Sequence, residues 1–278
     1  MQNEKIEALA FVKADLNYLP PLHERPRTYA YEPPNGEAKT NIVPEPHTLS
    51  VHNARAIAEA LSLDVEGFDL VRQKSTVLDF YDDEEVKRVY YPEAELLLKD
   101  ITGASRVFIF DHTVRKRVAG SADGISVVRQ PVGRVHVDHT ARSGPQRVRD
   151  LIPDDAEELL KGRVQIINLW RPIRGPLRDS PLAVCDARTV KFDELVPTDL
   201  IYQHRIGETY SVKFNPEHRW LYVPEMTVDE ILLLKCFDSK TDGRARFAPH
   251  TAFVDPTTSA DAVPRESIEL RTLVFHPE

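Results

Sequence analysis

Short runs of β-branched, aromatic and other apolar residues follow one another along the chain after about residue 105. Pro, Gly and Asp separate these runs, and each has the length of a single strand. Regularly spaced short strands with such breaks are typical of antiparallel sandwiches and barrels. The pattern therefore predicts a mainly β protein, with strands near 107–110, 125–128, 135–138, 164–169, 210–214, 220–223, 231–237 and 268–275.

Helical spacing occurs before these strands and once among them. Apolar residues between 54 and 61 recur at helical intervals. Two more helices are expected over 82–91 and 92–101, because Pro92 is tolerated in the first turn of a helix. A further helical pattern near 144–161 interrupts the expected strands. We expect the earlier helices to flank the sheet and this insert to form a wall or lid over a site.

Seven prolines lie between residues 19 and 46, in a segment with little periodicity. Proline fixes φ and donates no backbone hydrogen bond, so it disfavours helix interiors and central strands alike. We therefore expect residues 1–50 to form an extended arm on the surface. Residues 51–278 are expected to form one β domain with a helical N-terminal part, since β domains of this length are common.

The composition narrows the class of partner. The formal net charge is −8, and basic residues are scattered among acidic ones, so the electrostatic footprint of a nucleic-acid-binding protein is missing. The apolar patch at 8–12 is too short for a signal-peptide core or a membrane span. Cys185 and Cys236 match no zinc spacing and suit a reducing compartment. We expect a soluble cytoplasmic protein with a small-molecule partner, and a homodimer is an open possibility.

The segment His136-Val137-Asp138 lies in an expected strand and is the first candidate metal motif. Residues i and i+2 of a strand face the same side, so His136 and Asp138 can reach one metal ion. His250 lies 112 positions after Asp138, a separation that a jelly-roll barrel bridges by pairing an early strand with a late one. Two imidazoles and one carboxylate form the facial triad that holds non-haem Fe(II) and leaves three coordination positions open.

The surroundings of His250 favour its role as the third ligand. It follows the strongly apolar segment 230–237 after a short loop, which can return the imidazole to the mouth of a barrel. His139 is its main local rival. Because His139 comes directly after Asp138, it should point to the opposite face of the strand. We therefore expect His139 to support the ligands or to face the substrate.

An Arg-x-Ser motif near the C-terminus provides a candidate anion clamp. Arg265 and Ser267 are separated by two positions, so one strand face presents a guanidinium fork and a hydroxyl to the same carboxylate. Arg265 follows His250 by 15 positions. Arg271 has the same parity on the expected strand and is the alternative clamp.

The ordered set His136, Asp138, His250, Arg265 and Ser267 resembles the Fe(II)/2-oxoglutarate-dependent oxygenase superfamily. A narrower similarity, to the CmcJ/GA4-desaturase-like group of fungal and bacterial natural-product pathways, covers about residues 50–278. The fold implied is a double-stranded β-helix, the jelly-roll or cupin-like core, with flanking helices. The segments that carry the narrower similarity are 64–70, 164–173, 175–183 and 267–271.

This resemblance implies an Fe(II)- and 2-oxoglutarate-dependent dioxygenase in which the triad holds the metal and Arg265 and Ser267 hold the co-substrate. Its substrate would be a natural-product intermediate that undergoes hydroxylation, desaturation, ring formation or endoperoxidation, with succinate and CO₂ as co-products. No protein acid or base is required beyond the metal centre. Candidate substrate contacts are His139, Arg142, Trp170, Tyr202 and Arg115.

Two interpretations from other classes compete with the oxygenase. A cupin-like hydrolase or isomerase could use zinc or manganese in the same triad, and it would have no need of Arg265. A non-catalytic barrel that binds a small ligand would make the triad a coincidence, and its ligand binding would be insensitive to a chelator.

Overall fold

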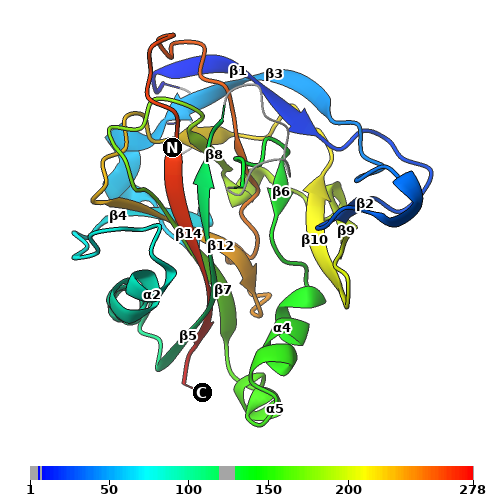
Figure 1. The fold of residues 1–278 in the computed structure, drawn as a ribbon, viewed down its shortest axis with the longest axis vertical. Coiled ribbons are helices and arrows are strands. Elements are labelled where there is room, and N and C mark those ends of the chain that lie inside the picture. The colour runs from blue at the N-terminus through cyan, green and yellow to red at the C-terminus, as the bar shows by residue number, and fades with distance from the viewer. Residues whose placement is uncertain (1–5, 7, 119–128, 278) are drawn as a thin grey trace.

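Two mainly antiparallel sheets form the protein in the computed structural model, which describes residue 6, residues 8–118 and residues 129–277 (Figure 1). The larger sheet has nine strands, in the order β1 (Phe11–Tyr18), β3 (Glu45–Asn53), β11 (Trp220–Tyr222), β8 (Leu182–Cys185), β13 (His250–Ala252), β6 (His136–Val137), β10 (Ile206–Val212), β9 (Leu195–Ile201) and β2 (Arg27–Tyr29). The smaller has five, in the order β4 (Phe68–Arg72), β12 (Glu230–Asp238), β7 (Val164–Pro172), β14 (Glu266–Phe275) and β5 (Arg106–Lys116). The mainly β, jelly-roll class expected from the sequence is confirmed.

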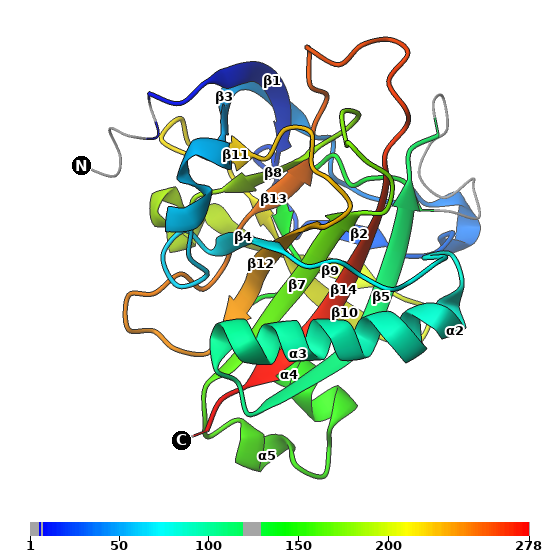
Figure 2. The ribbon, with the colours of Figure 1, turned by 90° about the vertical axis from the view of Figure 1, so that its left-hand side faces the viewer.

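The central strands of the smaller sheet are buried on both faces, which explains the apolar runs in β12 and β7. On β7, Ile167 and Leu169 pack on one side in a cluster that includes Leu98. Ile166 and Trp170 point to the other side, into the main core between the sheets. Figure 2 shows helix α3 lying across the outer face of β12, β7, β14 and β5. The helix therefore closes one face of this sheet, and the opposite face is left for the site.

The two helices expected over 82–91 and 92–101 are one continuous helix, which corrects the sequence-based prediction. The Asp82 carboxylate caps it by accepting from the backbone N–H groups of the first turn, and Gly103 ends it with φ of 69°. Pro92 has no N–H to donate, and the wider π-helical turn before it accommodates that loss. The segments are α2 (Asp83–Glu85), the π turn η3 (Val86–Tyr90) and α3 (Tyr91–Thr102).

The N-terminal part is built into the larger sheet to a greater extent than a surface arm would be. Strands β1 and β3 pair along their whole lengths, and β3 also pairs with β11, so the expected boundary at residue 50 falls inside a strand. The proline-rich stretch between them holds the short β2 and the 3₁₀ turn η1 (Pro34–Gly36). The helical spacing after residue 51 corresponds to the 3₁₀ helix η2 (Ala54–Ala60). The expected strand at 125–128 lies outside the described residues.

The insert after the H-x-D strand is helical, as predicted. It contains α4 (Ser143–Leu151) and α5 (Ala156–Leu159), and α4 packs through buried Val148 into the main core. Two single-turn 3₁₀ helices, η4 (Ala187–Thr189) and η5 (Phe192–Glu194), follow β8. Within the described ranges, no helix has the length and apolar character needed to cross a membrane.

The contact between Gly144 of α4 and Phe237 of β12 predicts the effect of a small substitution. A Cβ atom at Gly144 would lie 2.6 Å from Cγ of Phe237, and this ring is held in the core. Helix propensity favours alanine by about 1 kcal/mol, but overpacking a core contact costs about 1–3 kcal/mol. We expect Gly144→Ala to lower the free energy of unfolding, as measured by denaturant titration. Gly133→Ala, whose nearest neighbour would be 4.0 Å away, should change it little.

Candidate metal centre

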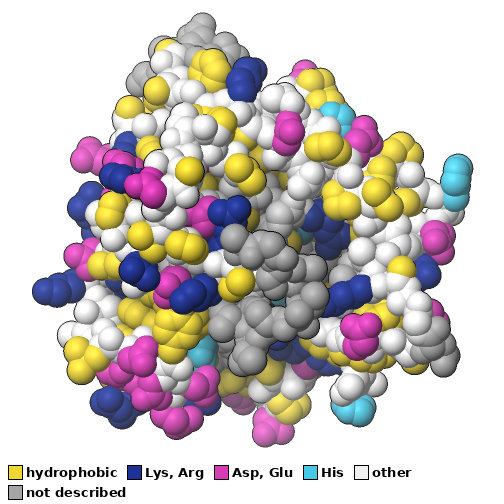
Figure 3. Space-filling model, turned by 45° about the horizontal axis from the view of Figure 1, so that its top comes forward, with side chains coloured by type: hydrophobic (Ala, Val, Ile, Leu, Met, Phe, Trp, Pro, Cys, Tyr) yellow, Lys and Arg dark blue, Asp and Glu magenta, His cyan; other side chains and the backbone are white. Residues whose placement is uncertain are grey.

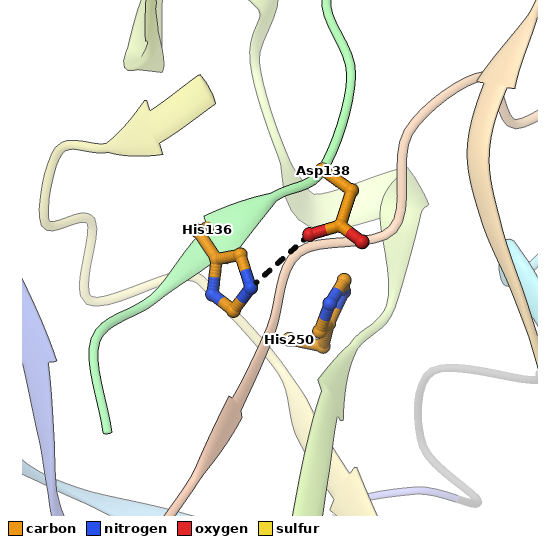
Figure 4. Close-up of side chains that lie close together, drawn as sticks. All are labelled: His136, Asp138 and His250. Carbon is orange, nitrogen blue, oxygen red and sulfur yellow. Dashed lines mark ion pairs between the residues drawn. The ribbon is translucent and has the colours of Figure 1, made fainter. Parts of the chain in front are cut away.

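Strand pairing brings together the three residues of the sequence motif (Figure 4). Strand β13 lies beside β6, and His250 is directly opposite His136 in the register of the two strands. Their ring centroids are 4.5 Å apart. One ligand atom from each of His136, Asp138 and His250 lies within 4.8 Å of the other two. The early and late strands of the jelly roll therefore place the triad at one point, as the separation in sequence predicted.

Both imidazoles are held in the form that binds a metal. Nδ1 of His136 lies 2.8 Å from the backbone oxygen of Arg134, and Nδ1 of His250 lies 3.0 Å from that of Ala248. A carbonyl oxygen can only accept, so each Nδ1 is the donor and each Nε2 keeps a free lone pair. Burial and the neighbouring His136 lower the pKa of His250, which also favours the neutral ring.

The carboxylate of Asp138 presents its two oxygens to different partners. Oδ1 lies 3.4 Å from Nε2 of His136. Oδ2 accepts hydrogen bonds from Nδ2 of Asn168 at 2.8 Å and from Nε of Arg271 at 3.1 Å. Burial raises the pKa of Asp138, but the charge of Arg271 and the neighbouring His136 outweigh it and hold the pKa well below its usual range. A ligand that is already ionised needs no deprotonation when a cation binds.

Arg271 is enclosed by acidic partners. Besides Asp138, its guanidinium donates to Oδ2 of Asp111 at 3.1 Å and to Oε2 of Glu269 at 2.9 Å. It also donates to Oγ1 of Thr113 at 3.0 Å. Burial lowers the pKa of Arg271, but these carboxylates raise it above its ordinary value. The charge of this arginine is thus already balanced by side chains of the protein.

Arg265 has the opposite environment. It is only 2% exposed, its Nε donates to Oγ of Ser267 at 3.0 Å, and its Nη1 donates to the backbone oxygen of Ser180 at 2.9 Å. No carboxylate of the described residues forms an ion pair with its guanidinium. Burial and the nearby Arg115 lower the pKa of Arg265 to about 9. A buried cation without a carboxylate partner is an electrostatic site for an anion.

Three of the five candidate substrate contacts lie in the interior around the triad. Trp170 is 2% exposed, the guanidinium carbon of Arg265 lies 4.8 Å from its ring centroid, and its indole N–H has no partner in the described structure. Arg115 donates to the backbone oxygen of Gln130 at 2.8 Å, and burial lowers its pKa. Burial lowers the pKa of His139 to about 4, so its ring is neutral.

The other two candidates lie further out. Arg142 is exposed immediately before α4. Tyr202 is half-buried in the turn between β9 and β10, with the guanidinium carbon of Arg205 3.9 Å from its ring centroid. Neither side chain takes part in the described hydrogen bonds around the triad. Figure 3 shows Lys and Arg side chains spread over one face of the molecule among acidic ones.

Sequence reasoning did not assign Asn168 or Glu269 to the site. Both are buried polar residues in strands that are otherwise mostly apolar, at 0% and 6% exposure. Asn168 lies opposite Arg271 in the register of β7 and β14, and Glu269 precedes Arg271 by two positions. The signal available in the sequence was a polar residue within a buried strand. Asn168, for example, lies on the strand face that carries Trp170.

A cavity of about 1140 Å³ lies elsewhere, around η2 and β4. The residues that line it do not include the triad. Its arginines are paired with buried acids: Arg55 and Arg72 both lie 2.9 Å from Oε1 of Glu230, and Arg188 lies 3.0 Å from Glu66. Because these arginines are ion-paired, the cavity differs from the surroundings of Arg265, whose guanidinium has no ion-paired carboxylate among the described residues.

Comparisons by family model, by sequence and by structure all find oxidoreductases that are similar to this chain. A family model described as an oxidoreductase/YMDC permease-like domain matches residues 16–275. The hydroxylase/desaturase efuI of Hormonema carpetanum is 40% identical over 246 residues, which are 81% of this chain and 82% of that protein. The Fe(II)/2-oxoglutarate-dependent dioxygenase nvfI of Aspergillus novofumigatus is 34% identical over 254 residues, covering 89% of this chain and 90% of the relative. A solved structure of the iron and alpha-ketoglutarate-dependent endoperoxidase NvfI superimposes with a TM-score of 0.87 at 29% identity, covering 96% of this chain and 99% of that one.

Proposed function

Because this chain belongs to the Fe(II)/2-oxoglutarate-dependent dioxygenases, we propose that His136, Asp138 and His250 are its iron ligands. The protein is an oxidoreductase with Fe(II) as cofactor and 2-oxoglutarate and O₂ as co-substrates. The observation that carries the ligand assignment is the convergence of the three ligand atoms, with both Nδ1 groups bonded to carbonyls. Two neutral imidazoles and one ionised carboxylate fit Fe(II), and bound iron supplies the activation of O₂ for oxidation of the substrate.

Arg265 and Ser267 are assigned to the far carboxylate of 2-oxoglutarate. Arg265 is a buried cation that lacks a carboxylate partner among the described residues, and its guanidinium is fixed by Ser267 and by the carbonyl of Ser180. An anion in this position would receive charge-assisted hydrogen bonds in a site shielded from water. Arg271 suits the role less well, because three carboxylates already surround it.

The substrate is a small molecule of natural-product biosynthesis. The relatives include hydroxylase/desaturases, and the superimposed structure is an endoperoxidase, so hydroxylation, desaturation, ring formation and endoperoxidation are the outcomes considered for this chain. Each would yield succinate and CO₂ from 2-oxoglutarate. Trp170, His139 and Arg115 are proposed to line the interior beside the triad, and Arg142 and Tyr202 to contact a substrate that extends outward. These residues act by binding, orientation and exclusion of water.

We place this activity in the cytoplasm, on one jelly-roll domain whose N-terminal segment contributes to the larger sheet. The proposed partner is the small-molecule substrate, with neither nucleic acid nor a membrane required. The scattered basic residues support this partner class, and the two free, buried cysteines suit a reducing compartment. A homodimer is compatible with the proposal.

The experiment that tests the proposed function is an anaerobic visible spectrum of the metal-free protein, taken after Fe(II) and again after 2-oxoglutarate. We expect a charge-transfer band that requires both additions, because both ligands must meet at the same metal. Omission of 2-oxoglutarate or its replacement by succinate is the control. Fe(II) binding without the band would favour the metal hydrolase interpretation, and absence of metal binding would favour the ligand-binding barrel.

A further inference from the structure

Asp138 and three neighbouring side chains form a closed ring of hydrogen bonds. Nδ2 of Asn168 donates to Oδ2 of Asp138 at 2.8 Å and to Oε1 of Glu269 at 2.9 Å. Arg271 closes the ring, with Nη2 bonded to Oε2 of Glu269 at 2.9 Å and Nε bonded to Oδ2 of Asp138 at 3.1 Å. Three of the four residues come from the paired strands β7 and β14, where Asn168 lies opposite Arg271.

The orientation of the Asn168 amide follows from its neighbours. Two carboxylate oxygens accept at the same end of the amide, so the NH₂ group faces them and the amide oxygen turns away. The opposite orientation would set a carbonyl oxygen against both acids. Asn168 Oδ1 has no hydrogen-bond partner in the described part of the chain, although the residue is fully buried. Within the described residues, Oδ1 of Asn168 is therefore a buried acceptor without a partner, while its Nδ2 bridges Asp138 and Glu269.

We propose that Asn168, Arg271 and Glu269 are positioning residues that hold the Asp138 carboxylate with Oδ1 directed to the metal site. This inference rests on the proposed function. Oδ1 lies beside Nε2 of His136, and Oδ2 accepts from two donors. A carboxylate that bound through both oxygens would take one of the three coordination positions that the facial triad leaves open.

Glu269 has a second effect in this ring, through charge. The ring contains two carboxylates and one guanidinium, so it carries a net negative charge beside the cation site. Without the Glu269 carboxylate, Arg271 would be balanced only by Asp138 and Asp111 among the described acids. Asn168 would at the same time lose the partner of its second N–H. The charge of Asp138 would then be shared more fully with Arg271 and be less available to a metal ion.

The test compares Fe(II) affinity in two ring variants and two matched controls. Glu269→Gln removes the ring charge at constant size, and Asn168→Leu removes the bridge. Glu266→Gln alters a buried acid of the same strand that bonds to Tyr81, and Gln165→Leu alters a buried amide of the same strand as Asn168 that bonds to Asp238. We expect anaerobic titration to show about 10–100-fold weaker Fe(II) binding in the ring variants and little change in the controls.

Circular dichroism and thermal unfolding, recorded on the same samples, separate a positioning role from a structural one. Wild-type Fe(II) affinity in both ring variants would overturn the proposal, as would a loss of stability without a change in affinity. If Asn168→Leu does not fold, Glu269→Gln decides alone, because it preserves the shape of the side chain. Failure of the wild-type protein to bind Fe(II) would instead defeat the proposed function itself.

Discussion

Replacing His136 with alanine is expected to abolish Fe(II) binding and turnover while the chain still folds. The substitution removes one of the three proposed metal donors, and the two that remain cannot reproduce the facial set. The structural cost is small, because the side chain is partly accessible and loses one hydrogen bond, to the backbone oxygen of Arg134, worth about 1 kcal/mol. Metal content after anaerobic reconstitution and a 2-oxoglutarate-dependent visible spectrum measure the effect.

His139→Ala is the matched control for this prediction. His139 is adjacent to Asp138 in the sequence, and its Nδ1 lies 3.3 Å from Oγ of Ser143 at the start of α4. Its ligand atoms are not part of the cluster formed by the triad. We expect His139→Ala to retain Fe(II) binding. If His136→Ala retained the metal and His139→Ala lost it, the ligand role proposed for His136 would pass to His139.

The grouping of His136, Asp138 and His250 could be predicted from the sequence because it follows from strand alternation and from the order of the residues along the chain. Strand alternation places His136 and Asp138 on one face, and the jelly roll pairs an early strand with a late one. The structure adds the direct pairing of His136 with His250 and the carbonyls that fix both tautomers. Those carbonyls belong to residues two positions before each histidine, and sequence patterns carry no information on where a backbone oxygen points.

The strands with strong apolar patterns were predicted, and those defined by their partners were not. β7, β12 and β14 are long and buried on both faces, so their composition identifies them. β8 and β13 have four and three residues, which is too short for a periodic signal. β1 and β3 were missed because the prolines between them suggested an arm, although the flanking segments alternate enough to pair.

The hydrogen-bonded ring that contains Asp138 could not be predicted from the sequence, for a different reason. A buried Asn or Glu in an apolar strand is visible in the sequence, but its partner depends on the register between strands. Asn168 meets Glu269 and Arg271 only because β7 and β14 pair in the observed register. Arg271 is enclosed by acids because β5 places Asp111 opposite it, Glu269 precedes it by two positions, and Asp138 lies beside it.

Removal of the Arg265 guanidinium should weaken 2-oxoglutarate binding strongly and leave iron binding in place. In the proposed complex, Arg265→Met would leave a buried carboxylate without its charged partner, which costs about 3 kcal/mol or more and corresponds to at least about 100-fold in affinity. Arg265 contacts none of the triad residues in the described hydrogen bonds, so Fe(II) affinity should stay near its wild-type value. Titration of the charge-transfer band with 2-oxoglutarate measures the first quantity, and anaerobic Fe(II) titration measures the second.

The stability of the Arg265→Met protein separates an anion clamp from a structural arginine. Without co-substrate, the wild-type protein holds a buried cation whose pKa burial lowers to about 9, and removing this charge offsets the loss of the hydrogen bonds to Ser267 and Ser180. We therefore expect the thermal midpoint to change little in the absence of 2-oxoglutarate, and the increase that 2-oxoglutarate causes in the wild type to disappear. Arg106→Met, at a partly exposed arginine that pairs with Asp155 and has no contact with Arg265, is the control and should keep that increase. A silent Arg265→Met together with loss of 2-oxoglutarate binding in Arg271→Met, at unchanged Fe(II) affinity, would transfer the clamp to Arg271.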